Sequence, residues 1–143
     1  MPSLALVDVN VLVALTWPQH VHHARARNWF SDWQGEWATC AITELGLVRL
    51  SMTPAAVGRA VAFADAVGML TRLRALPHHR FLDDGSSLTA PTVGLVRVGG
   101  YRQVTDIHLV NLAASSGAVL ATLDARLPDL LEPADRDHVL LLP

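Results

Sequence analysis

Hydrophobic residues along the chain form short continuous runs separated by stretches with helical spacing. Residues 4–7 are a short apolar run of the kind found in buried parallel strands. Residues 36–39, 117–122 and 138–142 are three further candidate strands. Helices are expected between them, at residues 10–16, from about 18 to 35, and at residues 105–115. Because strands alternate with helices, the pattern predicts an α/β fold with a mostly parallel sheet.

The middle of the chain is expected to be helical as well. One stripe with helical spacing consists of Ala41, Leu45, Val48 and Met52. Another helix is expected from Pro54 to about residue 70, because proline is favourable in a first helical turn. Residues 83–87 predict a loop, and a further helix at 89–98 would be stopped by Gly99 and Gly100. The inward face of the helix at 18–35 is expected to carry Val21, Ala24, Trp29 and Trp33.

Length and composition are those of one globular domain, residues 1–143. Of the 143 residues, 51% are hydrophobic and 17% are charged, which excludes a disordered chain. The single cysteine, Cys40, excludes an intrachain disulfide and fits a reducing cytoplasm. The apolar N-terminal stretch is interrupted by Asp8 and Asn10 and is too short to span a bilayer, so no membrane association is expected.

Two aspartates directly follow predicted strands, and a third opens a predicted helix. Asp8 and Asp124 are at strand ends, where ligand sites form in open parallel sheets. Asp106 begins the helix at 105–115 on its apolar side. Each aspartate also has a purely structural explanation, because Asp caps helices and is stabilised in a first helical turn by the helix dipole.

A fourth acid, Glu44, lies beside the apolar face of the helix that follows the second strand. A charged group in that position must be paired or must bind a ligand to offset its desolvation. An arginine such as Arg49 or Arg72 would make it a structural ion pair.

Taken together, the four acids predict a metal site. A right-handed parallel arrangement would bring them to the same edge of the sheet. Four adjacent carboxylates repel one another, and a hard divalent cation such as Mg²⁺ or Mn²⁺ removes that conflict. One or two such ions can activate water and stabilise the leaving oxygen of a phosphodiester.

The net charge does not exclude a nucleic-acid substrate. Arginine and lysine number 11 and acids 13, which gives a net charge of −2, and every basic residue is an arginine. Without the four candidate ligands the balance becomes positive, and arginine is well suited to bidentate phosphate contacts. A GC-biased genome would explain the absence of lysine equally well.

Four segments in order along the chain resemble the acidic motifs of PIN domains. They are Val7-Asp8-Val9-Asn10, Thr43-Glu44-Leu45, Thr105-Asp106-Ile107-His108-Leu109 and Thr122-Leu123-Asp124. The length is that of VapC-type toxins, and the resemblance covers nearly the whole chain. The segment Trp17-Pro18-Gln19-His20 is similar to one VapC subgroup.

This resemblance implies a three-layer fold with a five-stranded, mostly parallel sheet flanked by helices. It implies that Asp8, Glu44, Asp106 and Asp124 bind Mg²⁺ or Mn²⁺ and catalyse endonucleolytic RNA cleavage. It also implies a homodimer and a cognate VapB-type antitoxin. An antitoxin tail is expected to cover the apolar helices at 41–52 and 54–70 and to bring a basic residue to the acids.

Two polar residues, Asn10 and Thr122, are implied by position to assist in placing metal or water. A helix cap at Asn10 and a backbone-bonded hydroxyl at Thr122 are the alternatives.

Other functions remain open at this point. Seven histidines suggest zinc, but no HExxH motif is present, and His20, His22 and His23 are better explained as surface residues, unless one contacts RNA. The four tryptophans are expected in the core. Asp8 followed by Asn10 superficially suits aspartyl phosphoryl transfer, as in phosphatases, although the lysine usual in those enzymes is missing. A catalytically inert PIN-like binding module is the non-enzymatic alternative.

Overall fold

Five parallel strands form the centre of the protein, seen here in a computed structural model that describes residues 3–143. The strands are β1 (Leu4–Val7), β2 (Glu36–Cys40), β3 (His79–Leu82), β4 (Val119–Thr122) and β5 (Val139–Leu141). Their order in the sheet is β3-β2-β1-β4-β5, and every neighbouring pair is parallel. The predicted α/β class and the five-stranded parallel sheet are confirmed.

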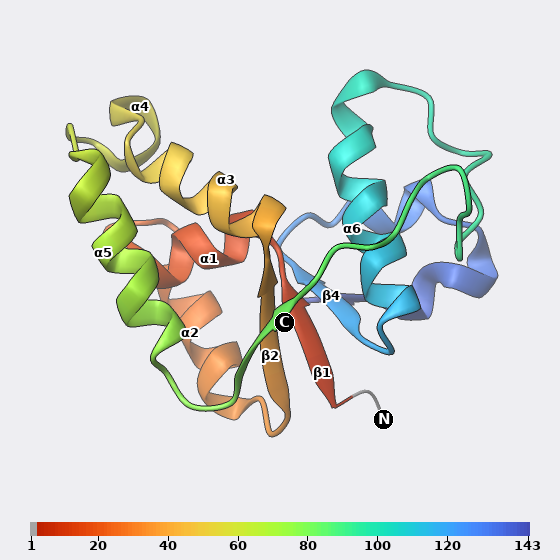
Figure 1. Cartoon of the computed structure of the whole chain (residues 1–143), viewed down its shortest axis with the longest axis horizontal. Coiled ribbons are helices and arrows are strands. Elements are labelled where there is room, and N and C mark those ends of the chain that lie inside the picture. The colour runs from red at the N-terminus through yellow and green to blue at the C-terminus, as the bar shows by residue number, and fades with distance from the viewer. Residues whose placement is uncertain (1–2) are drawn as a thin grey trace.

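Helices cover both faces of this sheet and give three layers. The α-helices are α1 (Val9–Thr16), α2 (His23–Asp32), α3 (Ala41–Ser51), α4 (Pro54–Val57), α5 (Phe63–Arg74) and α6 (Val104–Ser115). Three short 3₁₀ helices are η1 (Tyr101–Gln103), η2 (Leu127–Leu130) and η3 (Pro133–His138). Helices α1 to α5 lie on one side of the sheet and α6 lies on the other (Figure 1).

Strand β1 shows why both faces need a helical layer. Its four residues are all buried and alternate between the two sides. Leu4 and Leu6 pack in the core beneath α6, whereas Ala5 and Val7 pack in the core beneath α1 to α5. A continuous apolar run is therefore the correct signature of this strand.

The strand order places the end of β1 at the centre of one sheet edge. The chain leaves β1 towards β2 on one side, while β4 pairs with β1 on the other side. In open parallel sheets this reversal of direction marks the position where ligands bind. Asp8 follows β1 directly and Asp124 follows β4, so both lie at this reversal.

Helix α2 starts later than predicted. Instead of a helix from Pro18, residues 17–22 form turns, in which the amides of His20 and His23 donate to the carbonyls of Trp17 and His20. The His22 amide donates to His20 Nδ1 at 3.0 Å. The predicted inward residues Val21 and Ala24 are consequently exposed.

Helix α3 occurs where predicted, but its inward face was predicted wrongly. The buried residues are Thr43, Leu47 and Ser51, whereas Leu45 and Met52 are exposed. The cause is that polar groups are accommodated inside: Thr43 bonds the backbone of Cys40, and Ser51 accepts from the Trp17 indole. A prediction from hydrophobicity alone therefore took the outward stripe of α3 for its inward face.

The single helix predicted from Pro54 to residue 70 is interrupted. Gly58 adopts a left-handed conformation, with φ of 79°, and ends α4 after four residues. Glycine accepts this conformation without strain, which explains the break. Helix α5 then starts at Phe63.

The helix predicted at residues 89–98 does not form, and turns occupy these positions. Two backbone amides, those of Thr92 and Val93, donate to the buried Asn111 side chain at 2.6 and 3.3 Å. The Gly94 amide donates to Asp135 at 2.9 Å. Side chains thus take the donors that a helix would have used, and Pro91 supplies none.

Strand β3 was missed by the hydrophobic pattern. Only Leu82 of its four residues is buried, because β3 is an edge strand. The remaining predicted strands and the helices α1 and α6 are confirmed within one or two residues. No helix among residues 3–143 combines the length and the apolar character needed to cross a bilayer.

Two glycine substitutions should have opposite effects on stability. A Cβ atom on Gly46 of α3 would lie 2.6 Å from Val9 Cγ2 of α1, so Gly46→Ala is expected to cost about 1–3 kcal/mol of unfolding free energy. Gly68→Ala in α5 meets nothing closer than 3.7 Å and is expected to stabilise by up to about 1 kcal/mol. Urea unfolding of both variants measures the difference; equal effects would contradict the close contact between α1 and α3.

Candidate active site

Asp8 occupies the junction between β1 and α1. It is the N-cap of α1, and its Oδ1 accepts a hydrogen bond from the Val9 amide at 2.7 Å. Its Oδ2 accepts from the Thr122 hydroxyl at 2.8 Å, and the residue is only 6% exposed. The capping role is therefore real, but capping alone does not require this depth of burial.

Thr122 connects the ends of β1 and β4. Its hydroxyl donates to Asp8 and accepts from Asn10 Nδ2 at 3.2 Å and from the Asp124 amide at 3.1 Å. The Leu123 amide in turn donates to Asn10 Oδ1 at 3.2 Å. The hydroxyl proton therefore has one defined direction, towards Asp8, and both Asn10 and Thr122 hold that carboxylate in place.

The charges of neighbouring aspartates act on Asp8 and on Asp106. Burial raises the pKa of Asp8 to about 6, and the negative charges of Asp106 and Asp124 add to this effect against the hydrogen bond from Thr122. Burial also raises the pKa of Asp106, with a further contribution from Asp124. We refer to Asp8, Asp106 and Asp124 as the aspartate cluster. Neighbouring negative charges that raise the pKa values of Asp8 and Asp106 in a partly buried site favour the binding of a cation.

A cavity of about 310 Å³ lies beside two members of the cluster. Its lining residues are Arg102, Gln103, Asp106, Asp124, Arg126, Leu127 and Leu130. The Asp124 carboxylate faces Arg126, whose Nε is 3.7 Å from Asp124 Oδ1. The sequence analysis did not single out Arg102 and Arg126, because arginines are spread along most of the chain.

Glu44 has partners outside the aspartate cluster. Its carboxylate accepts from the Thr39 hydroxyl at 2.6 Å and lies 3.5 Å from Arg74 Nη1. The pairing arginine is thus Arg74 of α5, where Arg49 or Arg72 was expected. Glu44 is not among the charges that raise the pKa of Asp8 or Asp106.

The Thr39 hydroxyl also contacts His79 Nε2 at 2.8 Å. Since its single proton goes to Glu44, this hydroxyl accepts from the His79 ring. Burial, and then the charge of Arg74, lower the pKa of His79, which keeps the ring neutral. Glu44 therefore belongs to a polar network between β2, β3 and α5.

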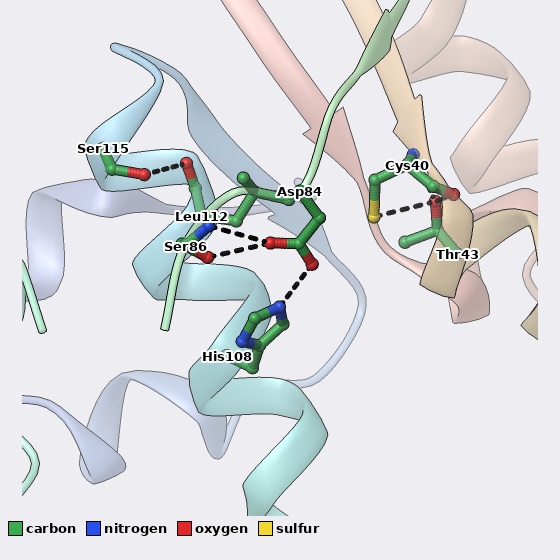
Figure 2. Close-up of polar contacts among 7 residues, drawn as sticks. All are labelled: Cys40, Thr43, Asp84, Ser86, His108, Leu112 and Ser115. Atoms are coloured by element: carbon green, nitrogen blue, oxygen red, sulfur yellow. Dashed lines mark hydrogen bonds and ion pairs between the residues drawn. The ribbon is translucent and has the colours of Figure 1, made fainter. Parts of the chain in front are cut away.

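A second acid–histidine pair lies next to α6. Asp84, just after β3, contacts His108 Nε2 through Oδ2 and accepts from the Ser86 amide and hydroxyl through Oδ1 (Figure 2). Burial opposes ionisation, but the hydrogen bonds from His108 and Ser86 outweigh it and hold the pKa of Asp84 below its usual range. The pair fastens the loop after β3 to α6. Sequence reasoning marked this loop but not its partner.

The remaining aromatic and histidine residues have structural positions. Trp17, Trp29 and Trp37 are buried, as predicted, whereas Trp33 is only partly buried. His23 Nδ1 lies 2.7 Å from the Ala14 carbonyl. Among residues 3–143, no three His, Cys, Asp or Glu side chains converge closely enough to hold one ion between them. In this arrangement a metal at the aspartate cluster would be held directly by at most two side chains, and any further acid would reach it through water.

Comparison with known proteins places this geometry in a family. The PIN domain family model matches residues 5–131. Ribonuclease VapC38 of Mycobacterium tuberculosis is 47% identical over 140 residues, which cover 97% of this chain and 98% of that protein. Ribonuclease VapC39 of the same species is 43% identical over 127 residues, 87% of this chain and 91% of its own. The chain therefore belongs to the PIN-domain family, in its VapC-type branch, as its acidic motifs predicted.

Proposed function

We propose that this chain is a metal-dependent endoribonuclease that hydrolyses RNA phosphodiester bonds at the aspartate cluster. The observation that carries the proposal is the buried Asp8, whose pKa is raised to about 6 by burial and by two neighbouring aspartates at the sheet edge. The names of the VapC38 and VapC39 relatives support RNA as the substrate.

The residues of the cluster fit Mg²⁺ or Mn²⁺. The three aspartates offer hard carboxylate oxygens, which these ions prefer. Mg²⁺ needs only one or two carboxylates because it keeps several of its waters, and this agrees with the spacing of the acids. When bound, such an ion supplies an activated water and neutralises charge on the phosphate.

The chain's own residues would prepare the site for that chemistry. Asp8 would be the central ligand, with Asp106 and Asp124 holding the ion directly or through water. The Thr122 hydroxyl fixes Asp8 Oδ2, and Asn10 fixes the hydroxyl, so both are positioning residues. The second-layer bonds that orient a metal ligand contribute strongly to metal affinity.

Glu44 stays in the proposal as the fourth acid of the site. Helix α3 starts at the end of β2, next to β1, so Glu44 is on the correct edge of the sheet. To become a ligand, its carboxylate would exchange Arg74 for the ion. The exchange is favourable only if the ion compensates for the loss of the ion pair with Arg74 and the hydrogen bond from Thr39.

Incubation of the purified protein with RNA tests this function. Cleavage is expected with Mg²⁺ or Mn²⁺, none in EDTA, and little with Ca²⁺, which tolerates looser geometry. An absence of both cleavage and divalent-ion binding would contradict the proposal and favour an inert binding module. Binding of a phosphoryl mimic to Asp8 would instead favour phosphoryl transfer.

We further propose that the protein is the toxin of a type II toxin–antitoxin pair, acts in the cytoplasm as a homodimer, and is neutralised by a VapB-type antitoxin. Four large apolar side chains are exposed on α3, on the residue after it and on α5. They are Leu45, Met52, Phe63 and Val67. Helices α3 and α5 pack against each other, so these residues offer an apolar surface for a partner helix.

Co-expression with the product of the adjacent upstream reading frame tests the antitoxin. We expect that product to co-purify with the chain and to restore growth. Leu45→Glu or Phe63→Glu should abolish co-purification and leave RNA cleavage intact. Val21→Glu, at a residue that is 86% exposed in a different region, is the control and should change neither. If the product neither binds nor restores growth, the proposal of an antitoxin encoded there is wrong.

A further inference from the structure

Arg74 pairs with Glu44, and the chemistry proposed above gives this arginine no role. Arg74 is in the last turn of α5 and Glu44 is in the first turn of α3, and the two helices lie side by side (Figure 1). Arg74 Nη1 is 3.5 Å from Glu44 Oε1, and the Glu44 side chain is only 12% exposed. A carboxylate with so little access to water depends on a counter-ion. A metal ion that uses Glu44 must therefore replace Arg74 first.

The two oxygens of the Glu44 carboxylate have separate partners. Oε2 accepts from the Thr39 hydroxyl at 2.6 Å, whereas Oε1 faces Arg74. His79 Nε2 donates to the same hydroxyl at 2.8 Å, which keeps the hydroxyl proton directed at Glu44. If Arg74 withdraws, Thr39 still orients the carboxylate, and Oε1 is left without a counter-ion. The network thus holds one oxygen and allows the other to change its partner.

Arg74 also has a place to which it can withdraw. Its guanidinium lies over the ring of Phe81 in strand β3, 5.1 Å from the ring centre. The Arg74 side chain is 43% exposed and Phe81 is 42% exposed. An arginine that leaves Glu44 therefore moves into water and keeps the attraction of the aromatic ring. Withdrawal breaks the ion pair but buries no unpaired positive charge.

A divalent cation and the guanidinium exclude each other at Glu44 Oε1, because two positive charges at one oxygen repel. Binding of the cation through Glu44 is then coupled to release of Arg74. The apparent affinity for the cation falls by the fraction of molecules in which Glu44 is free of the arginine.

We propose that Arg74 competes with the divalent cation for Glu44 and so lowers the metal affinity of the protein. The cation gains the charge of Oε1, directly or through water, only when Arg74 has moved away from Glu44. Arg74 is in this sense a positioning residue that acts on the metal through Glu44. The inference rests on the proposed metal-dependent function and assigns to Arg74 the control of metal occupancy.

The test is the dissociation constant for Mn²⁺, measured without RNA by the electron paramagnetic resonance signal of the free ion. Arg74→Ala is expected to bind Mn²⁺ about fivefold more tightly than the wild type, the size of effect that a half-exposed ion pair produces. Arg74→Lys keeps the charge and should stay close to the wild type. In a Glu44→Gln background, Arg74→Ala should have a much smaller effect, because the competition has been removed.

Thermal melts separate this role from a merely structural one. In EDTA, Arg74→Ala should melt below the wild type, because the Glu44 charge loses its counter-ion, and saturating Mn²⁺ should abolish that difference. Arg72→Ala is the matched control: it removes an exposed arginine of the same helix that pairs with no carboxylate among residues 3–143, and it should leave the Mn²⁺ affinity unchanged.

The inference is wrong if Arg74→Ala binds Mn²⁺ no more tightly than the wild type, or if its effect is equally large in the Glu44→Gln background. A stability loss that Mn²⁺ leaves unchanged would also contradict it and would make the ion pair purely structural. If the wild type and every variant fail to bind Mn²⁺, the metal-dependent function itself is wrong, and the inference falls with it.

Discussion

Asp8→Asn is expected to lower the rate of RNA cleavage at least about a hundredfold, because it removes the central charge of the metal site. The same change should stabilise the metal-free protein at neutral pH. Burial and two like charges raise the pKa of Asp8 to about 6, so its ionised form destabilises the fold above that pH. A residue that only caps the helix would show neither change, because asparagine caps a helix about as well as aspartate does.

The pH dependence follows from the direction of this shift. The unfolded Asp8 ionises near 3.8 and the folded one near 6, so the folded state binds more protons between these values and stability falls as pH rises through this window. The full shift corresponds to a gain in unfolding free energy on the order of 3 kcal/mol at pH 7. This is an upper bound, because the side-chain amide of Asp8→Asn disturbs the hydrogen bond that Asp8 Oδ2 accepts from the Thr122 hydroxyl. His79, whose lowered pKa acts in the opposite direction, is common to both proteins and cancels in their difference.

Thermal melts of wild type and Asp8→Asn in EDTA, from pH 4 to pH 8, measure this difference. The variant should be more stable at pH 7.5, and the advantage should shrink towards pH 4. Asp137→Asn, at an exposed residue of η3, is the control and should show no such trend. A variant that is less stable than wild type at every pH would contradict the expected destabilising effect of the buried Asp8 charge.

A divalent cation should reverse this order of stability. Only the folded chain assembles the aspartate cluster, so an ion at about 100 times its dissociation constant adds about 2.7 kcal/mol to the wild type. For a domain of this size the melting temperature should rise by about 10 °C. Asp8→Asn should respond little, because one central ligand and its charge are missing. An unchanged melting temperature of the wild type in millimolar Mg²⁺ and Mn²⁺ would contradict a preformed site.

The sequence was most informative where a segment is buried on both sides. The runs at β1 and β4 predicted strands correctly because both strands lie in the centre of a covered sheet. Strand β3 was missed because an edge strand can carry His79, Arg80 and Phe81 with little burial. The failed helix at 89–98 depends on Asn111 and Asp135, distant side chains that no local pattern reveals.

The site could be predicted only in part for the same reason. Asp8 and Asp124 were singled out because a strand end in a parallel sheet has a defined place, and Asp106 because it starts an amphipathic helix. An arginine partner was predicted for Glu44, but not the correct one, because Arg74 belongs to another helix and is distant in sequence. Arg102 and Arg126, which line the cavity beside Asp106 and Asp124, carry no sequence pattern and required the structure.

The most direct test of the metal site is the RNA cleavage rate measured across Mg²⁺ concentration for the wild type, Asp8→Asn, Asp106→Asn, Asp124→Asn and the Asp137→Asn control. We predict a saturable dependence on Mg²⁺ for the wild type and the control, with cleavage abolished in all three cluster variants although circular dichroism shows them folded. Near-normal cleavage in two of the three variants, or cleavage by the wild type in EDTA, would contradict the assignment of the aspartate cluster as the catalytic metal site.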